Sequence, residues 1–248
     1  MNFNLKNKIV LITGSTSGIG KIIAKKFLEE KCHVIITGRK TKNIIDKKKN
    51  QYVYNVDFEN FNSVKILKKK IKSKFRKIDV MVCNVGSGSG TRDLIIDKKN
   101  WNKSFDKNFN TFYNSFNIFF DILNKKKSSI VVISSIAGLE ALNAPIEYSV
   151  SKSALISYTK NISKKLRPGM RINLVSPGNI LMKGNNWYKK LSKDKKKVIQ
   201  YINNNVPMKK FGKPEDVANA VLFLSSNFSS FISGSNLIVD GGQTNRLL

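Results

Sequence analysis

A tyrosine and a lysine that could cooperate in proton transfer are separated by one helical turn in this sequence. Tyr148 and Lys152 lie four residues apart in the segment EYSVSK, so a helix would place both side chains on one face. A cation near a phenol favours the phenolate and lowers the pKa of the tyrosine, which suits a general acid or base. Because the chain has seven tyrosines and is rich in lysine, about one such pair is expected by chance. The interpretation therefore needs support from neighbouring residues.

Ser135 directly follows the apolar run 129–134 (SIVVIS), which is typical of a buried strand. Ligands bind at the carboxyl ends of parallel strands, so this serine is a candidate site residue. A Ser-Ser turn that simply ends the strand would explain the serine at this position as well.

A glycine-rich turn follows the first apolar run, at 13–20 (TGSTSGIG), and a helical pattern begins at once. Such a turn lets the backbone approach a phosphate, and the helix N-terminus offers free N–H groups. The spacing is not G-x-G-x-x-G, and Ile22 stands where a triphosphate-binding loop needs Ser or Thr. A plain strand-to-helix turn is the alternative. We predict a dinucleotide site with contacts from Gly14, Ser15, Ser17, Gly18, Ile19 and Gly20.

The second apolar run ends at Thr37-Gly38-Arg39-Lys40. A cofactor with a free ribose 2′-hydroxyl needs an acid here, which Gly38 cannot supply, whereas Arg39 and Lys40 could hold a 2′-phosphate. The site is therefore predicted to prefer NADP(H), with NAD(H) also possible.

Short runs rich in Val and Ile alternate with helical patterns along the whole chain. The predicted strands are 8–13, 33–37, 52–56, 79–83, 129–134, 171–175 and 236–239. Most are apolar on both faces, as buried parallel strands are. Helical spacing links Val64, Leu67, Ile71 and Phe75, and a second pattern runs from Trp101 to Phe120. This alternation predicts an α/β fold with a doubly wound sheet in one domain, 1–248.

Two segments differ from this alternation of strands and helices. The aromatic stripe between Trp101 and Phe120 has helical spacing, so we expect a core or subunit-interface face rather than a base-stacking platform. Residues 179–213 have weaker patterning, as a lid inserted over a site would. This segment sets the substrate, and it offers few anchors for an anionic one beyond its lysines.

The composition of the chain limits which partners, metals and cellular locations can be expected. The 248 residues carry a net charge of +29, which could mark a polyanion-binding surface. Lysine far outnumbers arginine, however, and asparagine and isoleucine are abundant, so A- and T-rich codons explain the charge better, and nucleic acid is an improbable partner. With one histidine, His33, and two cysteines, Cys32 and Cys83, no metal site is predicted. The chain has no apolar run long enough for a membrane span or signal peptide, so we expect a cytoplasmic protein without membrane association.

The order of these motifs resembles the compact, single-domain short-chain dehydrogenases/reductases, including those like 3-oxoacyl-carrier-protein reductase. The matching pieces, in chain order, are Thr13–Gly20, Asp57, Asn84-Val85-Gly86, Asn108, Ser135, Tyr148-x-x-x-Lys152, Pro177-Gly178 and Asp240-Gly241-Gly242. The resemblance implies a three-layer, doubly wound Rossmann-like fold with a mostly parallel seven-stranded sheet. It also implies a homodimer or homotetramer built on the helices around 101–120 and after Tyr148.

Roles for individual residues also come from this resemblance. Tyr148 would give a proton to a substrate carbonyl oxygen, and Ser135 would hold and polarise that oxygen. Lys152 would grip the nicotinamide ribose and depress the pKa of Tyr148. Asn108 would anchor the water chain of a proton relay. The further cofactor contacts would be Asp57, Phe58, Asn84, Val85, Gly86, Tyr148, Lys152, Pro177, Gly178 and Ile180. The chain departs from the family pattern at Val85, where alanine is usual, and at Leu181-Met182, where a threonine is common.

The sequence therefore favours an NAD(P)-dependent oxidoreductase that interconverts a carbonyl and a secondary alcohol. A cofactor-sensing regulator that has kept the fold is a second possibility, although the retained tyrosine argues against it. A basic nucleic-acid binder is a third, but no known nucleic-acid motif supports it. A sugar epimerase or dehydratase of the wider superfamily would usually have a longer chain.

Overall fold

Seven parallel strands form one sheet at the centre of the computed structural model, which describes residues 3–41 and 50–245. The strands are β1 (Ile9–Ile12), β2 (His33–Gly38), β3 (Gln51–Asn55), β4 (Val80–Cys83), β5 (Ser128–Ile133), β6 (Met170–Pro177) and β7 (Asn236–Val239). Their order is β3-β2-β1-β4-β5-β6-β7, and each adjacent pair is parallel. All seven predicted strands are present, with ends that differ by at most a few residues.

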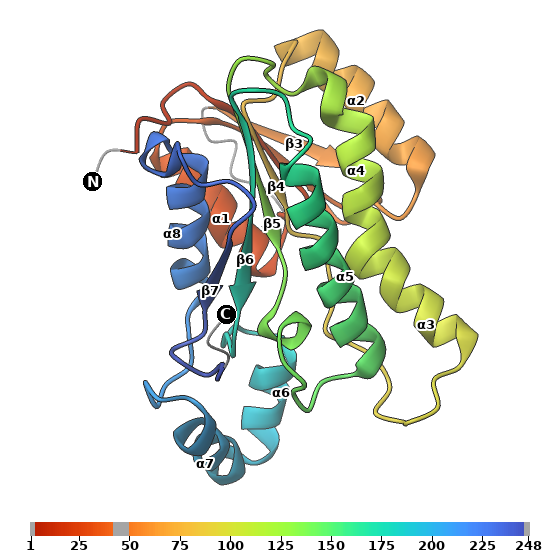
Figure 1. The fold of residues 1–248 in the computed structure, drawn as a ribbon, viewed down its shortest axis with the longest axis vertical. Coiled ribbons are helices and arrows are strands. Elements are labelled where there is room, and N and C mark those ends of the chain that lie inside the picture. Colours follow the sequence, from red (N-terminus) through yellow and green to blue (C-terminus); the bar gives the residue numbers. More distant parts are fainter. Residues whose placement is uncertain (1–2, 42–49, 246–248) are drawn as a thin grey trace.

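Helices cover both faces of the sheet, which gives the predicted three-layer Rossmann-like fold (Figure 1). The helices are α1 (Gly18–Glu29), α2 (Phe61–Phe75), α3 (Lys98–Phe105), α4 (Thr111–Phe119), α5 (Ile146–Ser163), α6 (Asn186–Lys193), α7 (Lys195–Asn205) and α8 (Pro214–Ser225). Helices α1 and α8 lie on one face, and α2, α4 and α5 on the other. Helices α6 and α7 lie beyond the carboxyl ends of the strands, at the bottom of Figure 1.

Two apolar cores form because successive side chains of a strand point to opposite faces. Leu11 packs in the core beneath α2, α4 and α5, whereas its neighbours Val10 and Ile12 pack in the core beneath α1 and α8. The central strands are thus buried on both sides, which explains their continuous apolar sequences. Within the described residues, no helix is long and apolar enough to cross a bilayer.

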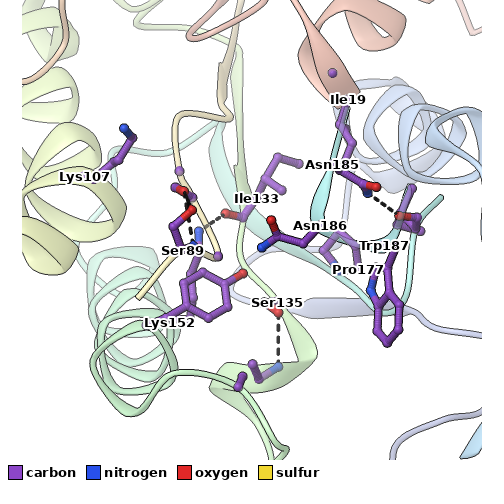
Figure 2. Close-up of a pocket in the computed structure, with 18 of the residues that line it drawn as sticks. Ile19, Ser89, Lys107, Ile133, Ser135, Lys152, Pro177, Asn185, Asn186 and Trp187 are labelled. Atoms are coloured by element: carbon purple, nitrogen blue, oxygen red, sulfur yellow. Dashed lines mark hydrogen bonds between the residues drawn. The ribbon is translucent and has the colours of Figure 1, made fainter. Parts of the chain in front are cut away.

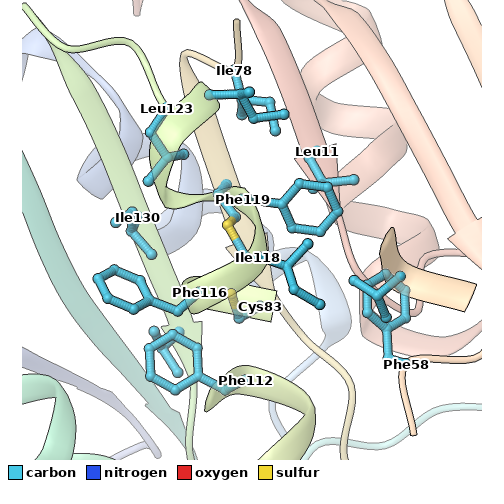
Figure 3. Close-up of a cluster of buried hydrophobic side chains, with 14 of the residues drawn as sticks. Leu11, Phe58, Ile78, Cys83, Phe112, Phe116, Ile118, Phe119, Leu123 and Ile130 are labelled. Atoms are coloured by element: carbon cyan, nitrogen blue, oxygen red, sulfur yellow. The ribbon is translucent and has the colours of Figure 1, made fainter. Parts of the chain in front are cut away.

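The aromatic stripe divides between the core and the surface. Phe112, Phe116 and Phe119 of α4 are buried against the central strands (Figure 3). Trp101 and Tyr113 remain exposed on the outer side. Between α3 and α4 the chain makes one turn of π-helix over Asp106–Asn110. Such turns are rare and occur often at functional sites.

Candidate active site

A cavity of about 900 Å³ opens at the carboxyl ends of the strands. It spans the point where the strand order reverses between β1 and β4, which is the usual ligand crevice of an open parallel sheet. Most predicted site residues line it. These are Gly14, Ser17, Gly18, Ile19, Arg39, Asp57, Phe58, Asn84, Val85, Gly86, Ser135, Tyr148, Lys152, Pro177, Gly178 and Ile180.

Four predicted site residues, Ser15, Gly20, Lys40 and Asn108, do not line the cavity. The Ser15 hydroxyl donates to the Ile12 carbonyl at 2.8 Å and accepts the Thr37 N–H at 2.9 Å, so it ties the turn to β1 and β2. At Gly20 an added Cβ would lie 2.4 Å from the Gly14 oxygen. These two residues shape the turn, and their predicted contact with the cofactor stays a prediction.

The glycine turn has the conformation that a diphosphate site requires. Gly14 and Gly18 have φ values of 64° and 59°, which side-chain-bearing residues rarely adopt. Ser17 is the N-cap of α1 and makes no side-chain capping bond, so the first N–H groups of the helix are available to an anion. Both the backbone geometry and the donor set therefore fit a dinucleotide phosphate.

A hydrogen-bonded connection from β4 holds this turn in place. The Thr13 hydroxyl accepts the Asn84 N–H at 2.9 Å, and the Asn84 side-chain amide donates to the Gly14 oxygen at 2.9 Å. The loop after β4 and the turn after β1 consequently form one rigid wall of the cavity.

Tyr148, Lys152 and Ser135 all line the same cavity, and Figure 2 shows Lys152 and Ser135 there. Tyr148 and Lys152 lie on α5, and Ser135 follows β5 and accepts the Ala137 N–H at 3.1 Å. The Lys152 ammonium is buried, donates to the Ile133 carbonyl at 3.0 Å and lies 5.9 Å from the centre of the Tyr148 ring.

Burial shifts the pKa values of two groups in this cluster. Burial raises the pKa of Tyr148, and its hydrogen bond with Ser135 opposes this only in part. The resemblance implied that Lys152 depresses the pKa of Tyr148, which stays a prediction; in this structure the Lys152 ammonium donates to the Ile133 carbonyl. Burial also lowers the pKa of Lys152 to about 8. Tyr148 is thus a protonated phenol at neutral pH.

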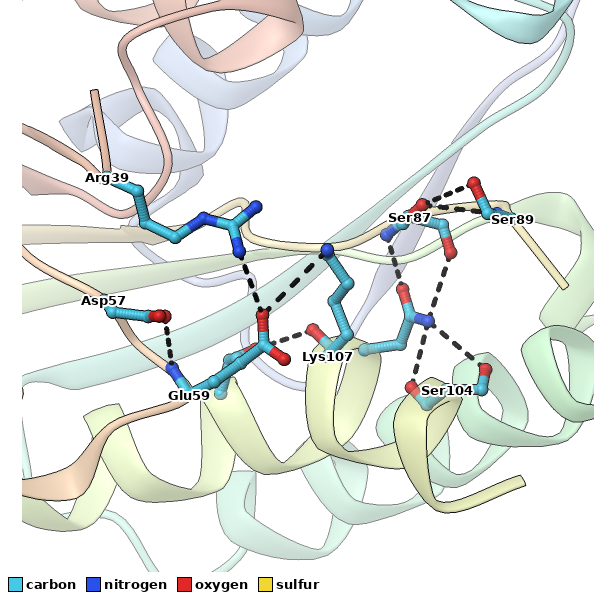
Figure 4. Close-up of polar contacts among 9 residues, drawn as sticks. Arg39, Asp57, Glu59, Ser87, Ser89, Ser104 and Lys107 are labelled. Atoms are coloured by element: carbon cyan, nitrogen blue, oxygen red, sulfur yellow. Dashed lines mark hydrogen bonds and ion pairs between the residues drawn. The ribbon is translucent and has the colours of Figure 1, made fainter. Parts of the chain in front are cut away.

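Asn108 lies in the π-helical turn, buried beneath the loop that follows β4 (Figure 4). Its Oδ1 accepts the Ser87 N–H at 2.8 Å, and its Nδ2 donates to the carbonyls of Ser87 and Ser104 at 3.1 and 3.0 Å. A Cβ on Gly86 would come within 3.0 Å of Asn108 Oδ1 and 3.2 Å of Lys152 Nζ. Asn108 therefore anchors the loop beside Lys152.

The far end of the cavity, beside β2 and β3, carries mixed charge (Figure 4). Arg39 and Lys107 both approach Glu59 Oε1, at 3.8 and 3.9 Å. Asp57 accepts the Glu59 N–H at 3.0 Å. Of the two basic residues predicted here, Arg39 lines the cavity, whereas Lys40 is exposed and is not among the lining residues.

Several lining residues had no predicted role, because no local pattern distinguishes them. Arg92 and the α6 residues Lys189, Lys190 and Lys193 line the cavity from two separate segments. Trp187 also lines the cavity and stacks on Tyr201 with 5.3 Å between ring centres.

Comparison with known proteins agrees with this geometry. The family model described as enoyl-(acyl carrier protein) reductase matches residues 14–244. The chain is 33% identical to the 3-oxoacyl-[acyl-carrier-protein] reductase FabG of Buchnera aphidicola, over 96% of this chain and 98% of that protein. It is 29% identical to the NAD-dependent glycerol dehydrogenase of Listeria innocua, over 98% and 96% of the two chains.

A solved structure of L-sorbose reductase from Gluconobacter frateurii, complexed with NADPH and L-sorbose, superposes with a TM-score of 0.90 at 25% identity, covering 100% of both chains. The ligand-free aldohexose dehydrogenase of Thermoplasma acidophilum gives a TM-score of 0.88 at 29% identity, covering 100% of this chain and 98% of that one. The chain therefore belongs to the short-chain dehydrogenase/reductase family, whose members are NAD(P)-dependent oxidoreductases acting on carbonyl and CH–OH groups.

Proposed function

We propose that the protein reduces a carbonyl compound to a secondary alcohol with NADPH, using Tyr148 as the proton donor. The observation that carries this proposal is the convergence of Tyr148, Ser135 and Lys152 in the cavity that also contains the open glycine turn. A regulator that only senses a cofactor would have no need for a protonated phenol next to a buried ammonium.

The chemistry follows from the state of these groups. The bound nicotinamide would supply the hydride for the carbonyl carbon. Ser135 and Tyr148 would both hydrogen-bond the carbonyl oxygen and so stabilise the negative charge that develops there. Because its pKa is raised, the Tyr148 phenol holds its proton until that oxygen becomes basic. The Lys152 ammonium would then stabilise the phenolate left behind.

Binding of the cofactor would use the two walls of the cavity. The N-terminus of α1 would hold the diphosphate, Asp57 and Phe58 would face the adenine, and Lys152 would contact the nicotinamide ribose. Asn108 would act through the loop that it anchors and through any water held there. Pro177, Gly178 and Ile180 would enclose the nicotinamide.

A preference for NADPH rests on Arg39, which borders the cavity at the end of β2 where a ribose 2′-phosphate would lie. Glu59 approaches the same guanidinium and would compete with that phosphate. The relatives include a protein solved with NADPH and one named as NAD-dependent.

We further propose that 179–213 acts as the substrate lid within a single domain, since α6 and α7 lie over the mouth of the cavity. The exposed side chains of Trp101, Tyr113 and Val150, on the outer helices, are suited to a dimer or tetramer contact. The cytoplasmic location stays a prediction.

The first test is a fluorescence titration of the purified protein with NADPH and, in parallel, NADH at physiological salt. Tighter binding of NADPH is expected, followed by NADPH oxidation with some member of a carbonyl panel. Tyr148→Phe should lower kcat by at least about 100-fold with little change in NADPH affinity. The matched control Tyr113→Phe removes a hydroxyl from an exposed tyrosine of α4 and should retain activity. Full activity of Tyr148→Phe would refute the assigned mechanism.

A further inference from the structure

One part of the cavity lining carries positive charge only. Arg92, Lys189, Lys190 and Lys193 contribute to the lining, and within the described residues its only carboxylates are Asp57 and Glu59. Those two acids lie with Arg39, beside the opposite edge of the sheet (Figure 4). In the part of the chain that the structure describes, neither Arg92 nor Lys190 has a carboxylate within ion-pair distance.

Arg92 is held close to the proposed proton donor by its backbone. The Thr91 N–H donates to Glu147 Oε1 at 2.8 Å, and Glu147 is fully buried directly before Tyr148. Gly90 packs so tightly here that a Cβ would lie 2.6 Å from Pro145 Cβ. The loop that carries Arg92 is therefore fastened to the first turn of α5.

Lys190 approaches from the lid. Its ammonium lies 4.7 Å from the centre of the Trp187 ring, which itself packs against Tyr201 and Phe211. Lys190 and Arg92 line the same cavity. Partial burial and the nearby charge of Arg92 lower the pKa of Lys190. Two cations held close together without an acid repel one another. An anion bound between them turns this repulsion into attraction for both.

General lysine richness does not account for this arrangement. Lysines 195–197 of the neighbouring helix α7 are exposed and do not line the cavity, whereas Arg92 and Lys190, which are also exposed, do line it. Arg92 and Lys190 come instead from segments far apart in the sequence, and both line the cavity that Tyr148 also lines. A guanidinium and an ammonium together match the oxygens of a phosphate or carboxylate.

We propose that the substrate is a carbonyl compound carrying an oxyanion, a phosphate or a carboxylate, which Arg92 and Lys190 bind at the mouth of the cavity. This inference rests on the proposed reductase function and names the substrate class for it. Of the lysines that the lid offers to an anion, it assigns this role to Lys190.

Trp187 provides a direct binding assay, because the chain has two tryptophans and Trp101→Phe leaves Trp187 as the single one. In that background, with NADP+ saturating, its emission is titrated with sodium phosphate and with sodium acetate while NaCl holds the ionic strength constant. A saturable change is expected for at least one anion, and its affinity should fall roughly tenfold or more in Arg92→Gln/Lys190→Gln. Lys196→Gln on α7 is the matched control and should keep the parent affinity. No saturation, or equal affinity in the double variant, overturns the inference.

Turnover is compared with matched ketone pairs, dihydroxyacetone phosphate with dihydroxyacetone and acetoacetate with ethyl acetoacetate. We expect kcat/KM to be at least roughly tenfold higher for the anionic member of one pair, which identifies phosphate or carboxylate as the preferred group. In Arg92→Gln/Lys190→Gln the kcat/KM values for the two members of that pair should become equal. Arg92→Lys should retain part of the preference for the anionic member.

The two proposals fail in different ways. Equal kcat/KM within both pairs, together with no saturable anion binding, refutes the anion site and leaves the reductase function intact. Anion binding that depends on Arg92 and Lys190, with NADPH bound but no carbonyl in the wider panel reduced, supports the site and refutes the reductase function.

Discussion

Gly20→Ala tests whether this glycine serves packing rather than cofactor contact. The sequence placed Gly20 among the cofactor ligands, but in the structure it lies behind the turn. An added Cβ would lie 2.4 Å from the Gly14 oxygen, 2.5 Å from Asn84 Nδ2 and 3.0 Å from the Ser15 Cα. The nearest of these atoms belongs to the backbone, so a side-chain rotation cannot relieve the overlap.

The expected loss of stability in Gly20→Ala can be worked out from the atoms that the added Cβ would displace. Overpacking of this kind costs about 1–3 kcal/mol. Displacing Asn84 would also break its 2.9 Å hydrogen bond to the Gly14 oxygen, worth about 1 kcal/mol. We therefore expect a loss of about 3 kcal/mol, which for a chain of this length lowers the Tm by roughly 6–12 °C.

The assay is thermal unfolding followed by circular dichroism, without cofactor and at one fixed protein concentration, so that binding does not contribute to the stability. Gly184→Ala is the comparison, because nothing lies within 4 Å of its added Cβ and only its φ of 85° opposes a side chain. That variant should lose about 1–2 kcal/mol. A Gly20→Ala protein that melts with the parent, and is weakened only in NADPH binding, would refute the packing argument.

Three further predictions concern the cofactor end, proton transfer and the core. The reduction rate should fall as pH rises through about 8, because Lys152 is cationic only below its lowered pKa; a pH–rate profile that stays flat up to about pH 9 contradicts this. Arg39→Gln should raise KM for NADPH roughly tenfold and leave KM for NADH nearly unchanged, and equal changes in both would remove Arg39 as the discriminator. Phe119→Ala, at a fully buried position, should cost about 3–5 kcal/mol in urea denaturation, and a loss below about 1 kcal/mol would show that the core repacks.

The sequence alone determined the fold class, the pairing of Tyr148 with Lys152 and the position of the glycine turn. Parallel strands buried on both faces must be apolar throughout, so β1, β4 and β5 could be recognised from short runs of residues. Tyr148 and Lys152 were paired by helical geometry, which is local. The glycine turn was recognisable because only glycine adopts its backbone conformation without strain.

Only the tertiary structure decided how each residue is used. Ser15 and Gly20 belong to the glycine motif but face β2 and the loop after β4, and Arg39 reaches the cavity where Lys40 does not. Arg92 and Lys190 are nearly a hundred residues apart in the sequence, so no local pattern could bring them together. The pKa of Tyr148 likewise depends on burial and on where the Lys152 ammonium points. Periodicity and turn chemistry act between near neighbours in the chain, whereas burial, like-charge proximity and side-chain direction arise only when distant segments pack together.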